Sequence, residues 1–291
     1  MEKHLLVTVS EQPSALNGIR FVGRFFSNKE EMKLTLLYIA PRPPAVWEDE
    51  RTHDRVTQIE QKARQYEAKG RKALEDAKRE LVTLGLSQDQ VKTKLQMRQF
   101  SKVLDIVQEA EKGLYDAVVL GPRGLSRLEE AFDESTSREL LRKRGTFPIW
   151  TCRKPDLERK NVLLCVDGSE PALRMADHVG FILAQERTQE VTLFVVVKPG
   201  EKASEGAEKI ISVSKEHLLR NGFPAELVTS RVVKQSNVLK AIQGEAEQGK
   251  FAVVAAGRTG RGRGFLDRLF VGSVTDALFR EVKAAALWTC H

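Results

Sequence analysis

The sequence predicts an α/β fold built from two tandem, doubly wound domains, each with a five-stranded parallel sheet. Short apolar runs alternate with amphipathic helical patterns along the chain, which is typical of βαβ units. The same ordered motifs also occur twice. At 291 residues, 41% of them hydrophobic, the chain is long enough for two buried cores. We expect domains at residues 1–155 and 156–291, with the charged segment 153–160 as the linker.

Three pairs of matching segments indicate the duplication. LLVTVSEQPSAL (5–16) matches VLLCVDGSEPAL (162–173), YDAVVLGPRG (115–124) matches FAVVAAGRTG (251–260), and PIWTC (148–152) matches ALWTC (286–290). The pairs keep the same order, and a longer insert around residues 41–55 lengthens the first copy. The chain is therefore a tandem repeat of one domain.

Strands and helices alternate most clearly in the second copy. Short apolar runs predict buried strands at 162–166, 191–197, 225–233, 251–257 and 285–290. Helices are predicted between them at 171–185, 210–219, 237–248 and 273–281; in the first, Leu173, Ala176, Gly180 and Leu183 share one face. Because a helix separates each strand from the next, consecutive strands are expected to be parallel.

The first copy has the same pattern with a longer second helix. Apolar residues recur there at helical spacing, at Val56, Ile59, Ala63, Tyr66, Ala73, Ala77 and Leu81. We expect an amphipathic helix packed on the sheet. A partner-binding coiled-coil helix is the alternative, but Gly70 falls on the apolar stripe and the run is short for a coiled coil.

The net charge of +7 raises the question of nucleic-acid binding. Basic residues are interleaved with acids, however, and from Glu48 to Leu81 nine Lys or Arg accompany nine Asp or Glu. Such a segment is typical of a solvated helix face rather than of a stripe that binds phosphates. The sequence also lacks a basic patch interleaved with aromatic residues, so no specific nucleic-acid site is predicted.

Composition argues against several other classes of protein. No apolar run approaches the ~20 residues that span a bilayer, and MEKHLLVTVSEQPS lacks the apolar core of a signal peptide, so we expect a cytoplasmic protein with no membrane contact. The three cysteines, Cys152, Cys165 and Cys290, form no CxxC pair and are expected to be reduced. The five histidines lack metal-ligand spacing, so no metal site is predicted.

The stretch GRTGRGRGFLDRLFVGS (257–273) is the strongest candidate for a binding site. It follows a predicted strand, and open parallel sheets bind ligands beyond the carboxyl ends of their strands. Gly257 and Gly260 permit backbone N–H groups to converge on an anion, and Gly272 permits a phosphate to approach closely. Ser273 can cap the helix that follows. Four arginines against Asp267 give a net charge of +3. A phosphate site and a flexible strand-to-helix turn both fit this composition.

The matching stretch of the first copy, GPRGLSRLEEAFDES (121–135), lacks these properties. Two arginines and four acids give it a net charge of −2, and Glu134 stands where the second copy has Gly272. A phosphate there would meet both a side chain and a negative charge. The sequence therefore favours the second loop as the anion site.

These motifs resemble the universal stress protein family, and the resemblance covers nearly the whole chain as two tandem domains. Nucleotide-binding members of that family have an Asp just after the first strand and a G-x2-G-x9-G-[ST] pattern after the fourth. In this sequence Asp167 follows VLLCV, Gly257 and Gly260 open the loop, and Gly272-Ser273 close it. Eleven residues rather than nine separate Gly260 from Gly272. Nine residues separate Gly262 from Gly272, so Gly262 is the alternative to Gly260.

The resemblance implies a Rossmann-like fold of the adenine nucleotide α-hydrolase type, with strand order 3-2-1-4-5, and an ATP site in the second domain, with or without Mg. The implied ligand residues are Cys165, Val166, Asp167 and Val196 on the adenosine side, and Gly257, Gly260 or Gly262, Gly272, Ser273 and Val274 on the phosphate side. Asp167 would bind the ribose hydroxyls, although an acid at a helix N-terminus fits as well. Ser273 fits a plain helix N-cap too.

The first domain departs from the family pattern. Ser10 stands where the second domain has Asp167, and Glu134 replaces the third glycine, which implies a domain that binds no nucleotide. Family members also pair through their last strands. The resemblance therefore implies that PIWTC and ALWTC join the two domains as an intrachain pseudo-dimer, with a homodimer of whole chains as a further option.

Three functions follow from these observations. The leading hypothesis is a stress-response protein that binds ATP or a related adenine nucleotide through its second domain. The alternative is an interaction module that binds no nucleotide and acts through protein partners, which the longer loop and the altered first domain favour. The third, an adenylating or sulfur-transfer enzyme, lacks a catalytic constellation, so at most slow ATP hydrolysis is expected.

Overall fold

Strands alternate with helices in both copies, in a computed structural model that describes residues 2–43, 53–122, 147–200, 203–258 and 274–290. The N-terminal half contains β1 (Lys3–Thr8), α1 (Leu16–Phe25), β2 (Met32–Ala40), α2 (His53–Thr83), β3 (Val91–Met97), α3 (Lys102–Gly113), β4 (Ala117–Leu120) and β5 (Ile149–Thr151). The C-terminal half contains β6 (Val162–Cys165), α6 (Glu170–Leu183), β7 (Val191–Val197), α7 (Ala203–Arg220), β8 (Val228–Lys234), α8 (Val238–Gln248), β9 (Val253–Gly257), α9 (Val274–Glu281) and β10 (Ala286–Cys290).

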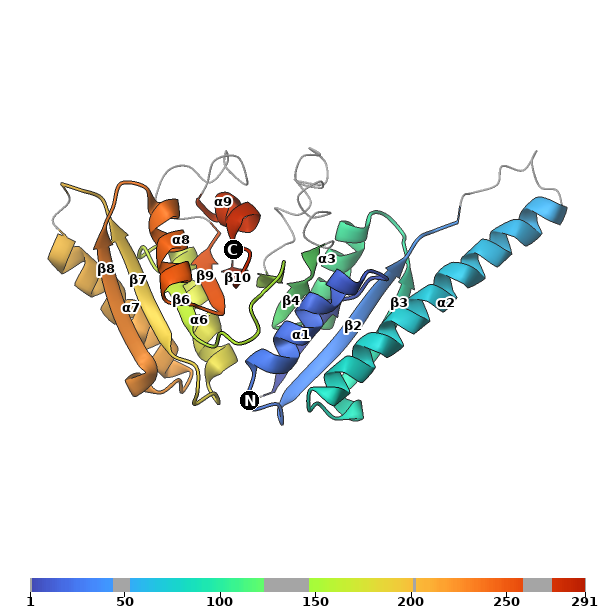
Figure 1. Cartoon of the computed structure of the whole chain (residues 1–291), viewed down its shortest axis with the longest axis horizontal. Helices are drawn as coiled ribbons and strands as arrows, with labels where there is room; N and C mark the ends of the chain where they lie inside the picture. Colours follow the sequence, from blue (N-terminus) through green and yellow to red (C-terminus); the bar gives the residue numbers. More distant parts are fainter. Residues whose placement is uncertain (1, 44–52, 123–146, 201–202, 259–273, 291) are drawn as a thin grey trace.

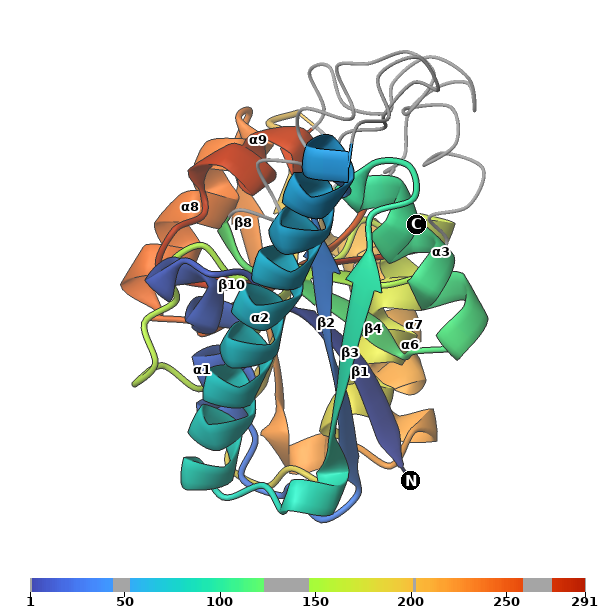
Figure 2. The same cartoon turned by 90° about the vertical axis from the view of Figure 1, so that its right-hand side faces the viewer.

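The described strands form one sheet in the order β3-β2-β1-β4-β5-β10-β9-β6-β7-β8 (Figure 1, Figure 2). Within each half every neighbouring pair is parallel and follows the order 3-2-1-4-5. The halves meet through β5 and β10, which pair antiparallel with Trp150 opposite Trp288. The predicted doubly wound α/β fold is confirmed, and the last strands of the two copies lie side by side at the centre of the sheet.

Two element boundaries in the C-terminal half differ from the sequence prediction by three or more residues, each for a local reason. α7 begins at Ala203 rather than at Ile210, because its first turns carry few apolar residues and so give no periodic signal. β8 begins at Val228, because residues 225–227 form a 3-10 turn after Pro224. The other strands of the C-terminal half lie within the predicted ranges.

The helices bury a continuous core on one face of the sheet and two separate cores on the other. α1, α2, α6 and α7 pack on the first face, where one apolar cluster runs from Leu81 in α2 to Leu218 in α7. On the opposite face α3 covers a cluster of its own, and α8 and α9 cover another. The apolar cores of the two halves are therefore continuous on one face only.

Helix α2 packs on the sheet with its C-terminal part, as the amphipathic pattern predicts. Gly70, Leu74, Ala77 and Leu81 are buried. A Cβ at Gly70 would lie 2.7 Å from carbon atoms of both Tyr38 and Leu95, so the glycine marks the point where α2 crosses β2 and β3 most closely. The first turns extend beyond the ends of these strands (Figure 1), and Val56 is 41% exposed.

Two stacked tryptophans fill the junction between the halves. The rings of Trp150 and Trp288 are fully buried, with centroids 4.0 Å apart and planes 9° from parallel. Phe25 and Phe26 of the N-terminal half pack against the pair from the end of α1. Such aromatic contacts contribute stability in addition to the stability gained from the apolar area that they bury.

Polar groups from the two halves also bond across the junction. Trp150 Nε1 donates to His178 Nε2 at 3.1 Å, and burial lowers the pKa of His178 to about 3, so the ring is a neutral acceptor. The buried Glu186 carboxylate accepts hydrogen bonds from the backbone N–H groups of Ser27 and Asn28, at 3.1 and 3.2 Å. Because buried polar groups are costly without partners, these bonds specify how the halves meet.

None of the helices in the described segments is both long and apolar enough to cross a membrane. The three cysteines are free thiols, and burial raises the pKa of Cys152 and of Cys290, the latter to about 12. Both are therefore inert core residues at neutral pH.

Replacing one tryptophan of the stack should destabilise the whole chain. We expect Trp288→Ala to lower the free energy of unfolding by about 3–5 kcal/mol, because it leaves a cavity between the two halves. Trp288→Phe, which keeps a ring in the stack, should cost clearly less. Urea denaturation followed by far-UV circular dichroism measures both. Equal midpoints for wild type and Trp288→Ala would show that the stack contributes nothing.

Candidate functional site

The strand order of the C-terminal half reverses between β6 and β9. The chain leaves β6 toward β7 on one side, whereas β9 lies on the other, and such a reversal is where open α/β sheets bind ligands. Cys165, at the carboxyl end of β6, pairs with Ala256 of β9 and with Phe194 of β7. The predicted site residues that the structure describes lie at this edge or at the start of α9.

Asp167 forms the turn from β6 into α6. Its Oδ1 accepts a hydrogen bond from the Ser169 backbone N–H at 2.9 Å, and Gly168 has φ 77°, which favours glycine. Ser169 is then the N-cap residue of α6. The structure thus gives Asp167 a local role in the turn that leads into α6.

Three other predicted residues flank Asp167 on different faces of the sheet. Cys165 and Val196 are half-buried against the cluster under α8 and α9, and burial together with the Asp167 carboxylate raises the pKa of the Cys165 thiol. Val166 is buried in the continuous core on the other face, and its N–H bonds to the Phe194 carbonyl at 3.0 Å. The side chains of Cys165 and Val196 can therefore line a site, whereas that of Val166 cannot.

Gly257 ends β9 and touches the first turn of α6. A Cβ at this position would lie 2.7 Å from Ala172 N and from the Pro171 carbonyl carbon, closer than side chains tolerate. At Gly121, the matching residue of the N-terminal half, the nearest atom would be 3.4 Å away. Gly257 is therefore required for the close approach of β9 to α6, a role that sequence reasoning did not assign to it.

Most of the glycine-rich loop lies outside the described residues. This applies to Gly260, Gly262, Gly272 and Ser273. Val274 is the first residue of α9 and is 36% exposed. The predicted helix after the loop is thus present, and its N-terminus follows directly on Gly272-Ser273.

Arg258, which contributes to the predicted positive charge of the loop, bonds to the N-terminal half. Its side chain is only 8% exposed, and its Nη2 donates to the carbonyl of Phe147 in the N-terminal half at 2.9 Å. The partners are far apart in sequence, so no local signal could predict this contact.

The N-terminal half has different chemistry at the matching strand ends. Ser10 takes the place of Asp167, and its buried Oγ has no hydrogen-bond partner among the described residues. The next residue, Glu11, accepts a hydrogen bond from the Tyr38 hydroxyl at the end of β2. Glu134 lies outside the described residues.

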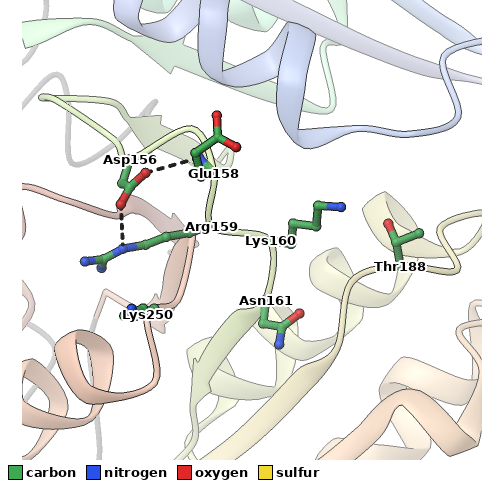
Figure 3. A pocket seen from close by; sticks show the side chains of 7 residues that line it. All are labelled: Asp156, Glu158, Arg159, Lys160, Asn161, Thr188 and Lys250. Carbon is green, nitrogen blue, oxygen red and sulfur yellow. Dashed lines mark hydrogen bonds and ion pairs between the residues drawn. The ribbon is translucent and has the colours of Figure 1, made fainter.

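An open pocket of about 430 Å³ lies at the opposite end of the C-terminal sheet (Figure 3). It is lined by Asp156, Glu158, Arg159, Lys160, Asn161, Thr188 and Lys250, which lie next to the amino ends of β6, β7 and β9. The guanidinium of Arg159 is already paired with Asp156 and Glu247. This pocket is therefore separate from the predicted site residues at the carboxyl ends of the strands.

Comparison with known proteins identifies the fold. Residues 1–144 and 158–287 match the sequence profile of the universal stress protein family. A universal stress protein from Archaeoglobus fulgidus has a similar structure, with a TM-score of 0.68 and 16% identity over 99% of this chain and 97% of that one. A functionally unknown protein from Pseudomonas aeruginosa has a TM-score of 0.50 and 15% sequence identity, over 99% of this chain and 92% of that one. No curated protein sequence matches.

A third solved structure is a universal stress protein in complex with cAMP. It is 22% identical and covers 46% of this chain and 97% of its own, with a TM-score of 0.38.

The two matching glycines provide an internal test of the packing at the site. Gly257→Ala should lower the free energy of unfolding by about 1–3 kcal/mol, because the new Cβ overpacks the first turn of α6. Gly121→Ala, the matched control, should cost much less, since its nearest neighbour is 3.4 Å away. Urea denaturation of both variants measures the two losses in the free energy of unfolding. Equal costs would show that β9 does not need to approach α6 so closely.

Proposed function

The chain belongs to the universal stress protein family, and from this premise we propose that its C-terminal half binds ATP or a related adenine nucleotide. The N-terminal half binds none and supports the site. The observation that carries the proposal is the difference between the two copies at the same strand ends. Asp167 and the Gly-rich loop are present in the C-terminal copy, whereas Ser10 and Glu134 replace Asp167 and Gly272 in the other.

The adenosine part would lie over the ends of β6 and β7. Asp167 follows the carboxyl end of β6, and a carboxylate there can accept hydrogen bonds from both ribose hydroxyls. Cys165 and Val196 are half-buried on one face beside it and offer apolar contact to the base. Val166, whose side chain is buried in the core, would take part only through its backbone.

The phosphates would lie between the end of β9 and the start of α9. In this proposal Gly257, Gly260 or Gly262, Gly272, Ser273 and Val274 surround them. A helix N-terminus carries unpaired N–H donors and a partial positive charge, and α9 begins directly after Gly272-Ser273. A Mg ion would accompany ATP as its counter-ion.

The wider proposal is a stress-response protein of the cytoplasm. The three free cysteines support a reducing compartment. The antiparallel pairing of β5 with β10 supports an intrachain pseudo-dimer of domains 1–155 and 156–291. A homodimer of whole chains would have to use another surface, because both edges of β5 and of β10 are already paired within the sheet.

Direct binding measurements test the proposal. We expect protein purified without added ligand, then denatured, to release an adenine nucleotide detectable by mass spectrometry. Calorimetric titration with ATP and Mg should give one site per chain. Asp167→Ser, which copies the N-terminal half, and Gly272→Glu should each weaken binding at least about tenfold, the equivalent of 1.4 kcal/mol.

Asp76→Ser is the matched control, because Asp76 is an exposed acid on α2. It should leave the affinity unchanged. No released nucleotide and no heat at millimolar ATP would refute nucleotide binding and favour an interaction module that acts through protein partners. Binding that survives Gly272→Glu would refute the placement of the phosphates.

A further inference from the structure

Arg258 connects the start of the glycine-rich loop to the N-terminal half. Its backbone N–H donates to the Cys290 carbonyl at 2.7 Å and so continues the pairing of β9 with β10 by one residue. Its side chain then reaches Phe147, two residues before β5, where Nη2 donates to the carbonyl oxygen at 2.9 Å. The last described residue before the loop is thereby bonded to both halves.

This hydrogen bond is expected to be strong, because it is made by a charged group with little access to water. Burial lowers the pKa of the guanidinium to about 10, which leaves it charged at neutral pH. A buried charge that loses its acceptor is costly, and a charge-assisted hydrogen bond is about twice as strong as a neutral one. The position of Arg258 therefore depends on the position of the Phe147 carbonyl.

The residue before Arg258 is fixed from the other side. Gly257 lies against the first turn of α6, where even a methyl group would clash with Pro171 and Ala172. The end of β9 is thus confined between α6, which follows Asp167, and the N-terminal half. A shift of either neighbour would move the point from which the loop departs.

The N-terminal half also donates to the C-terminal half, from Arg153 Nε to the carbonyl of Phe279 in α9 at 3.0 Å, but the Arg258 contact has no counterpart at the matching position. The residue of the N-terminal half that matches Arg258 is Pro122, which has no side-chain donor. Phe147, in contrast, follows directly on residues 123–146, which contain the N-terminal half's own version of the loop. The half that lacks the ligand residues is thus bonded to the half that keeps them.

We propose that Arg258 is a positioning residue through which the N-terminal half sets the nucleotide affinity of the C-terminal half. The inference rests on the proposed function. Arg258 does not contact the nucleotide in this scheme. It fixes the end of β9 against Phe147, so that the loop starts from a defined place, and nucleotide binding is in turn transmitted to β5.

Removing the guanidinium should weaken ATP binding without removing the fold. Arg258→Met fills the same buried space but cannot donate, and we expect at least a tenfold loss of ATP affinity by calorimetry. The loss should persist at 0.5 M NaCl, where the Debye length falls to a few ångströms. A loss that disappears at high salt would show simple charge attraction and overturn the proposal. Arg258→Ala repeats the test if Arg258→Met does not fold.

Hydrogen exchange separates positioning from a general loss of stability. In the wild type, saturating ATP should slow amide exchange in the peptide that covers residues 147–152. In Arg258→Met, ATP at saturation should leave this peptide unchanged. Arg220→Ala removes the same charge from the exposed end of α7 and should behave as wild type. Wild-type affinity, or wild-type slowing at β5, in Arg258→Met would overturn the proposal.

Failure of the proposed function gives a different result. If the wild type binds no nucleotide, the nucleotide-free samples still test the contact. Arg258→Met should then exchange faster than wild type at residues 147–152. Equal rates would show that Arg258 does not fix β5.

Discussion

The antiparallel pairing of β5 with β10 is the constraint on which the rest of the structure depends. It turns two five-stranded sheets into one and places Trp150 directly opposite Trp288. Because the stacked rings leave no room for water, the helices on that face must close over them from both sides, and their apolar residues form one cluster. Neither half can keep this face buried alone, so the two copies depend on each other for stability.

The junction is specified by polar groups as much as by apolar area. Apolar surfaces tolerate sliding, whereas a buried hydrogen bond is satisfied at one geometry only. Glu186 with its two backbone donors and Arg258 with Phe147 each fix one point of contact. The two copies differ here too: Trp150 has His178 as acceptor, whereas Trp288 Nε1 has none among the described residues.

Duplication also explains how the two copies can differ at their strand ends while keeping one fold. Strand cores need only apolar residues of suitable volume, and both copies retain them. A ligand site needs particular groups at particular strand ends, and the loss of Asp167's counterpart leaves the core of the N-terminal half intact. The N-terminal half, with Ser10 where the other copy has Asp167, still contributes to the shared core and bonds to the end of β9.

The order of the elements, the duplication and the motif around Asp167 could all be predicted from the sequence, because burial and turn geometry produce local residue patterns. The sequence did not determine the start of α7, whose first turns lack an apolar stripe. Only the tertiary structure showed three features: why position 257 must be a glycine, which group Arg258 bonds to, and that Trp150 lies opposite Trp288. Each depends on atoms distant in the chain that meet once two surfaces are packed together, and no local pattern encodes how they meet.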